Sequence, residues 1–167
     1  MPVRTLLASA TLGLMACIAH ATDHPMLPAD TPAAYRQKCG SCHAAYPPGM
    51  LPARSWQRVM AGLGQHYGAT NAALDEHTDR ALGAWLQARA GSASNTAEPP
   101  QDRITRSTWF AREHDEIDPA VWRLPSVQSP ANCVACHAGT EEGDYDDDRL
   151  RVPAGLSARQ RRAWNWW

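Results

Sequence analysis

Apolar residues recur at intervals of three and four positions over three stretches in the first half of the chain, and this spacing predicts three helices. The first is expected over 31–39, with Thr31 as its N-cap and a proline in its first turn. The second is expected over 55–68, with Ser55 as its N-cap and a glycine at its end. Asp75 is expected to introduce the third. The first half is therefore predicted to be helical.

The second half of the chain lacks a comparable pattern. One short helix is expected around Trp109 to Ile117, and the prolines that follow it interrupt any longer element. No stretch shows the alternation of apolar and polar residues that is typical of a strand. We therefore predict a mainly α fold with extensive coil, in which the second half has little regular secondary structure.

A change in composition divides the chain into two domains. Residues 91–100 (G-S-A-S-N-T-A-E-P-P) have no apolar periodicity and end in two prolines, which is typical of a linker. The predicted organisation is a first domain over 22–90, this linker, a second domain over 101–155 and an arginine- and tryptophan-rich tail over 156–167. Domains this small usually need disulfides, a metal or a cofactor in addition to their hydrophobic core.

Residues 1–21 have the pattern of a cleaved secretory signal peptide. Arg4 precedes a short apolar stretch over 6–18, and A-H-A at 19–21 is an A-x-A-type cleavage site. Export to the periplasm is therefore expected, with lipid attachment through Cys17 as the alternative. No uninterrupted apolar stretch of about 18 residues occurs in the sequence, so no transmembrane span is expected in the mature chain.

Length and charge exclude two classes of protein. A chain of 167 residues is too short for a large multidomain enzyme. Its 16 basic and 17 acidic residues give a formal net charge of −1. Such a chain has no net positive field to neutralise phosphates, so no nucleic-acid partner is expected.

The cysteines carry the most specific chemical signal. They form two C-x-x-C-H motifs, C-G-S-C-H at 39–43 and C-V-A-C-H at 133–137, the signature of c-type haem attachment. Two thiols at this spacing reach the two vinyl groups of one porphyrin and become thioethers, and the next residue directs its imidazole at the iron. The motifs predict two covalently bound haem c groups, attached to Cys39, Cys42, Cys133 and Cys136. The proximal iron ligands would be His43 and His137.

Other uses of paired cysteines fit the sequence less well. The pairs of a Cys₄ zinc site usually lie roughly 15–20 residues apart, whereas Cys39 and Cys133 are 94 positions apart. A redox-active C-x-x-C is typical of a βαβ unit, and no strand is predicted here. Structural disulfides would leave the histidine after each pair unexplained.

The sixth ligand of each iron decides whether a small molecule can bind there. His66 lies at the edge of the apolar face of the second predicted helix, where a haem could rest, or is a surface residue at the helix end. His114 follows an aromatic pair in an otherwise charged stretch and is an equal candidate. The remaining candidates are His77, expected to be solvated, His24 near the new N-terminus, and the thioethers of Met50 and Met60.

Together these motifs resemble those of the exported dihaem cytochrome c family of proteobacteria. The first half of the family is matched by C-G-S-C-H-A-A-Y-P-P at 39–48, L-P-A-R-S-W at 51–56 and H-Y-G at 66–68. Its second half is matched by R-I-T at 103–105, W-F at 109–110, R-E-H at 112–114 and N-C-V-A-C-H at 132–137. The tail after Pro153 is not part of the family pattern.

The resemblance implies a low-potential electron carrier in which both irons are ligated by two histidines. Its first domain would be helical, like a small monohaem cytochrome c. His66 and His114 would be the distal ligands. Proximity in sequence pairs His66 with the first motif and His114 with the second, and a crossed arrangement stays open. The implied donor is a membrane-bound b-type cytochrome, and the implied acceptor is a monohaem oxygen-binding cytochrome c.

Outer-sphere electron transfer, without enzyme activity, is therefore the expected function. The alternative is a haem enzyme or sensor with one iron open to peroxide, O2 or NO, in which Arg112 and Glu113 would be distal groups. A docking subunit that only relays charge is a third hypothesis. For the tail, contact with a membrane interface, a cover over an exposed haem edge and disorder all stay open.

Overall fold

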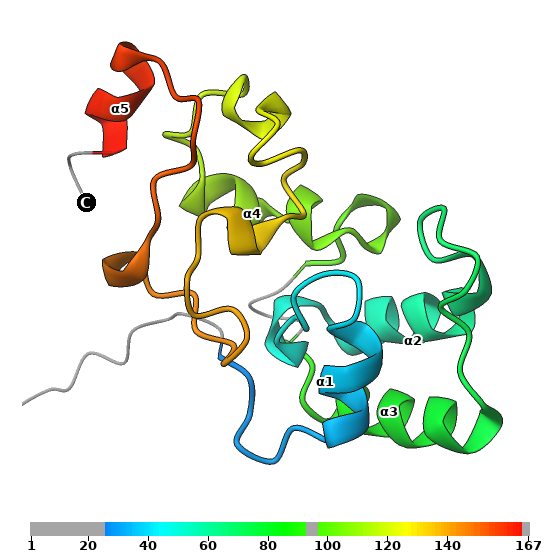
Figure 1. Ribbon diagram of the computed structural model, residues 1–167. Coiled ribbons are helices and arrows are strands. Elements are labelled where there is room, and N and C mark those ends of the chain that lie inside the picture. The colour runs from blue at the N-terminus through cyan, green and yellow to red at the C-terminus, as the bar shows by residue number, and fades with distance from the viewer. Residues whose placement is uncertain (1–25, 93–96, 165–167) are drawn as a thin grey trace, which may run out of the picture.

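The computed structural model describes residues 26–92 and 97–164 (Figure 1). The predicted signal peptide, Cys17, His24 and part of the predicted linker lie outside the described residues, so those assignments stay predictions. Within the described ranges all regular structure is helical, α or 3-10, and the only strand-like features are isolated bridges. The predicted mainly α, coil-rich fold is confirmed. None of the described helices is both long and apolar enough to cross a membrane.

Three α-helices build the first half of the molecule: α1 (Ala33–Cys39), α2 (Ala53–Ala61) and α3 (Glu76–Ala88). α2 and α3 lie side by side, and α1 packs against α3 (Figure 1). The core between the helices contains side chains that are at least 98% buried, those of Tyr35, Leu51, Leu82 and Leu86. Burying a side chain of this size stabilises the fold by about 1.5–3 kcal/mol.

The predicted start of α3 is correct, and those of α1 and α2 are wrong. The Asp75 carboxylate accepts a hydrogen bond from the Thr78 N–H at 2.9 Å, as an N-cap should. In α1 and α2 a proline occupies the N-cap position instead, where its missing N–H has no cost. The Thr31 hydroxyl donates to the Pro28 carbonyl, and Ser55 is fully buried inside α2.

The second helix also ends earlier than predicted. α2 stops at Ala61, and the Gly62 N–H donates to the Arg58 carbonyl at 3.0 Å. A 3-10 turn, η2 (Leu63–Gln65), follows. The glycines at 62 and 64 weaken a continuing α-helix because they carry the largest conformational entropy of any residue. As a result His66 lies outside the helix, in the segment that follows it.

The second half contains two short α-helices, α4 (Thr108–Glu113) and α5 (Ala158–Trp164), joined by coil and 3-10 turns. The Ser107 hydroxyl caps α4 by accepting from the Phe110 N–H at 3.0 Å. α4 is shorter than the predicted helix over 109–117, because His114 leaves helical geometry at φ −128° and ψ 19°. The 3-10 turns are η3 (Pro100–Asp102), η4 (Ile104–Arg106), η5 (Val121–Arg123), η6 (Cys133–Ala135) and η7 (Asp147–Arg149), with η1 (Pro48–Met50) in the first half.

The two halves share a core. Ile104 and Tyr145 of the second half are buried in the cluster that also contains Tyr35 and Trp56. A smaller cluster in the second half consists of Val121, Val127 and Leu156. The shared cluster places the two C-x-x-C-H motifs within one compact unit, although 94 positions separate them.

Candidate functional site

The first C-x-x-C-H motif begins at the C-terminal end of α1, which stops at Cys39. Gly40 continues the chain with its N–H bonded to the Arg36 carbonyl, and a Cβ at this position would lie 2.3 Å from that carbonyl oxygen. Only glycine therefore fits at position 40 without a shift of the backbone. Cys39, Cys42 and His43 all line one cavity of about 590 Å³.

A tight turn presents His66 to the same cavity. The Ala69 N–H donates to the His66 carbonyl at 2.9 Å, and the two residues between them have positive φ, 47° at Tyr67 and 101° at Gly68. The His66 imidazole faces His43 with the ring centroids 6.1 Å apart and the planes 30° from parallel. The structure thus brings His66 together with the first motif.

The environment of the first cavity favours a neutral His66. Burial lowers the pKa of His66, and the charges of His43 and Arg103 lower it further. The neutral imidazole is the form with a lone pair for a metal. The Arg103 guanidinium lies over the Tyr67 ring at 4.1 Å and also lines the cavity. It supplies a cation at the cavity wall, which suits a cofactor that carries carboxylates.

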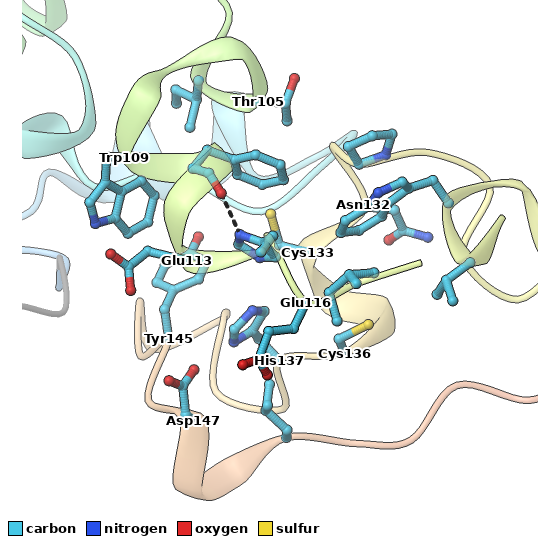
Figure 2. Close-up of a pocket in the computed structure, with 18 of the residues that line it drawn as sticks. Thr105, Trp109, Glu113, Glu116, Asn132, Cys133, Cys136, His137, Tyr145 and Asp147 are labelled. Carbon is cyan, nitrogen blue, oxygen red and sulfur yellow. Dashed lines mark hydrogen bonds between the residues drawn. The ribbon is translucent and has the colours of Figure 1, made fainter. Parts of the chain in front are cut away.

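The second motif is held by a short 3-10 turn, η6. The His137 N–H donates to the Cys133 carbonyl at 2.9 Å, which bends the chain so that Cys133, Cys136 and His137 line a second cavity. Figure 2 shows these three residues facing a common space, with Trp109 and Tyr145 on its other side. The Tyr145 ring lies 5.6 Å from that of His137.

His114, at the end of α4, lies in the same second cavity. Its Nδ1 is 2.9 Å from the Phe110 carbonyl (dashed line in Figure 2), and the Phe110 ring stacks on it at 4.1 Å with the planes 17° from parallel. The centroids of His114 and His137 are 6.2 Å apart. Burial lowers the pKa of His114 and so favours its neutral form.

In two of the four histidines that line the cavities, Nδ1 lies within hydrogen-bond distance of a backbone carbonyl. Nδ1 of His114 faces the Phe110 carbonyl, and Nδ1 of His43 lies 2.7 Å from the Ala44 carbonyl. A carbonyl can only accept, so a neutral ring at either position carries its proton on Nδ1 and its lone pair on Nε2. This arrangement orients an imidazole that ligates a metal through Nε2.

These residues fit two haem groups by their donor set and spacing. An iron bound to two imidazoles at metal–nitrogen distances of about 2 Å would separate the ring centroids by roughly 6.3 Å, close to the observed 6.1 and 6.2 Å. All four described cysteines are unpaired thiols on the cavity walls. Burial raises the pKa of Cys39 and of Cys133 to about 11, so both thiols are protonated at neutral pH.

The two cavities differ in volume. The first, at about 590 Å³, is large enough for a macrocyclic cofactor, whereas the second measures about 80 Å³. The fit of the second site therefore rests on its residues: two thiols, two facing imidazoles, and the Tyr145 hydroxyl, which is buried there without a hydrogen-bond partner. In the described part of the chain no group of three or more His, Cys, Asp or Glu residues is arranged to hold a bare metal ion.

The other sequence-based candidates lie elsewhere or contribute walls. His77 is exposed in the first turn of α3, away from both cavities, as predicted. Met60 lines the first cavity, and Met50 is buried and lines the second. Arg112 and Glu113 form an ion pair with each other at 2.7 Å.

Comparison with known proteins identifies the family. A family model described as dihaem cytochrome c matches residues 35–145. The chain belongs to the dihaem cytochrome c family. Membership of this family implies an electron-transfer haem protein with two covalently bound haem c groups and their irons. The two motifs at 39–43 and 133–137 supply the thiols and histidines for those groups.

Solved dihaem cytochromes c resemble this one along most of their length. A diheme cytochrome c from Shewanella baltica is 35% identical to this chain and matches it with a TM-score of 0.63. The match covers 73% of this chain and 93% of the Shewanella chain. A protein from Rhodobacter sphaeroides, DHC, is 40% identical with a TM-score of 0.57, covering 68% of this chain and 96% of its own. A diheme cytochrome c from the same organism is 36% identical, with a TM-score of 0.61 and coverages of 71% and 98%. No curated protein matches the chain.

From the sequence, no role beside a histidine ring was predicted for three aromatic residues that shape these sites. Phe110 stacks on His114, Tyr145 lies beside His137, and Tyr46 stacks on His43 with the centroids 4.8 Å apart. Tyr46 follows the first motif by three positions, and Phe110 precedes His114 by one helical turn. These short spacings to a histidine are the signal that could have indicated their role.

Proposed function

We propose that this dihaem cytochrome c is an electron carrier in which both irons are ligated by two histidines, His43 with His66 and His137 with His114. One observation carries the proposal: two pairs of imidazole rings face each other, with ring centroids 6.1 and 6.2 Å apart. Each pair lies in the cavity that is also lined by one pair of cysteines. These contacts support the uncrossed pairing of motifs and distal histidines.

The protein's part is to hold and enclose the redox centres. A haem c supplies an iron that changes between the ferric and ferrous states. Each thiol pair fixes one edge of the group, and the carbonyls of Ala44 and Phe110 hold two of the imidazoles in the tautomer that ligates. Two imidazoles stabilise ferric iron more than a Met/His pair does, so low reduction potentials are expected.

If two histidines held each iron, neither would be open to a substrate, which would favour a carrier over an enzyme or sensor. Arg112 and Glu113 are the candidates for distal catalytic groups. Glu113 lines the second cavity, but it is paired with Arg112, and the side chains of Arg112 and Glu113 are 68% and 37% exposed. A distal acid–base pair would instead be desolvated and directed at an open iron. The geometry favours outer-sphere electron transfer.

The periplasm is the proposed compartment, because residues 1–21 have the pattern of a secretory signal. The proposed donor is a membrane-bound b-type cytochrome, and the proposed acceptor is a monohaem oxygen-binding cytochrome c. Resemblance to the family supports both partners. Measuring electron transfer between the purified holoprotein and each partner tests them.

Spectroscopy of the purified holoprotein tests the ligation. Electron paramagnetic resonance of the ferric protein should show two low-spin haems and no high-spin signal. The ferrous protein should not bind carbon monoxide rapidly. A high-spin signal equivalent to one haem, or rapid carbon monoxide binding, would contradict bis-histidine ligation and favour an open iron site.

A further inference from the structure

The C-terminal tail lies beyond the segment that the family model matches, which ends at Tyr145. After η7 the chain runs antiparallel to the second C-x-x-C-H motif. The Arg151 N–H donates to the Cys136 carbonyl at 2.6 Å, and His137 and Leu150 form an antiparallel bridge. The segment that leads into the tail is therefore fixed to the backbone of the haem-attachment motif itself.

A turn then directs the tail back over the second half. Gly155 has φ +87°, a conformation that favours glycine, and the Ser126 hydroxyl donates to the Ala154 carbonyl at 2.7 Å. Leu156, only 4% exposed, enters the small core with Val121 and Val127, which are each 1% exposed. A side chain of the tail thus completes a hydrophobic cluster of the second domain.

The helix that follows has its own start signal. The Gln160 N–H donates to the Ser157 hydroxyl at 3.3 Å, and the Ser157 N–H donates to the Gln160 side-chain carbonyl at 2.8 Å. This reciprocal pair is a capping box, which fixes the first turn of α5. Three arginines of the helix are exposed, Arg159, Arg161 and Arg162.

Trp164 is directed inward from the end of α5. It is partly buried, packs against the small core of Val121, Val127 and Leu156, and lines the second cavity together with His114 and His137. The helix therefore exposes its arginines to water and its tryptophan to the second haem site. Insertion of Trp164 into a membrane interface would instead require its indole to leave these contacts.

We propose that the tail is a built-in cover of the second haem site, in which Trp164 forms part of the wall and limits the access of water. The proposal rests on the proposed function, because it takes the second site to hold a haem ligated by His114 and His137. Water stabilises the charged ferric centre relative to the ferrous one, so excluding water raises the reduction potential of a haem. Removing the cover should lower the potential of the second haem alone.

The test compares the wild-type holoprotein with Trp164→Ala, Trp164→Leu and a chain truncated after Pro153. Arg162→Ala is the control, because it changes the exposed side of the same helix. Haem content is measured for each protein, and optical redox titration then resolves two waves. In the Trp164 variants the midpoint of one wave should fall while the other stays, with a larger fall for Ala than for Leu. The truncated chain should show the largest fall.

Unchanged midpoints in the Trp164→Ala protein with both haems retained would overturn the proposal. If the truncated chain does not retain both haems, the two point variants decide. Binding of the full chain to vesicles of phosphatidylcholine and phosphatidylglycerol in equal parts, lost in Trp164→Ala, would also overturn it in favour of membrane contact. A high-spin signal in the wild type would instead contradict the proposed ligation, so the two failures are distinguishable.

Discussion

The Tyr46 hydroxyl donates a hydrogen bond of 3.0 Å to the carbonyl oxygen of Ala131, across 85 positions of sequence. The same ring stacks on His43 with the planes 24° from parallel, and it lines both cavities. Ala131 lies two positions before Cys133. The Tyr46 side chain therefore joins His43 of the first motif to the segment that leads into the second motif.

Replacing Tyr46 by Phe should remove this hydrogen bond and keep the stacked ring. The free energy of unfolding, measured with guanidinium chloride on the holoprotein, should fall by about 1 kcal/mol. The spectrum of the first haem should not change, because the contact with His43 is kept. Tyr46→Leu removes the ring as well and should lower the free energy of unfolding further. Equal stabilities of Tyr46→Phe and the wild type would show that the bond contributes nothing.

Replacing either distal histidine by Ala should open one haem. His66→Ala and His114→Ala should each give a high-spin ferric signal equivalent to one haem and carbon monoxide binding by half of the ferrous haem. The double variant should show both. His77→Ala is the matched control, because His77 is exposed in α3 and lines neither cavity. A wild-type spectrum in both single variants would contradict the assigned ligands.

The stability of the second site should depend on the Ser107 cap of α4. Ser107 is 5% exposed and accepts from the Phe110 N–H, so Ser107→Ala should lower the free energy of unfolding by about 1 kcal/mol. Because α4 carries His114, acid or heat should convert the second haem to a high-spin form earlier than in the wild type. Thr108→Ala, at the exposed neighbouring position, is the control. The prediction fails if both variants behave alike.

The ion pair between Arg58 and Asp102 should make stability depend on pH. Hydrogen bonds from Arg58 lower the pKa of Asp102, at N···O distances of 2.6 and 2.8 Å. A lowered folded-state pKa contributes stability above the unfolded value of about 3.9, and this contribution is lost as the pH falls through the folded value. Asp102→Asn should therefore be less stable at neutral pH, and its melting temperature should fall less steeply below about pH 4.

Melting temperature against pH is the measurement for this pair. Asp115→Asn, at an exposed position after α4, is the control and should follow the wild type. Parallel curves for the wild type and Asp102→Asn would show that the pair does not contribute. The pair joins α2 to η3, directly before Arg103 at the wall of the first cavity.

Local signals in the sequence predicted the local structure well where one residue dominates. Asp75 caps α3 because its carboxylate reaches the Thr78 N–H without help from the rest of the fold. Thr31 and Ser55 offer the same chemistry, yet the prolines at 32 and 52 occupy the N-cap positions. Where two start signals compete within a few positions, spacing alone does not decide between them.

The candidate site was predictable in its residues and less so in its geometry. The spacing of C-x-x-C-H identifies thiols and histidine because a porphyrin edge imposes that spacing. The positions of the proposed distal histidines depend on contacts distant in sequence. His66 was expected on a helix, whereas it lies in a tight turn after η2. Its pairing with His43 needs the packing of α1, α2 and α3, which no local pattern contains.

The hydrogen bond between the Arg151 N–H and the Cys136 carbonyl joins the second attachment motif to a segment that is made after it. A chain is made from its N-terminus, so the motif emerges before the residues that pack over it. We therefore expect haem to be attached to Cys133 and Cys136 before Leu156 and Trp164 pack beside that site.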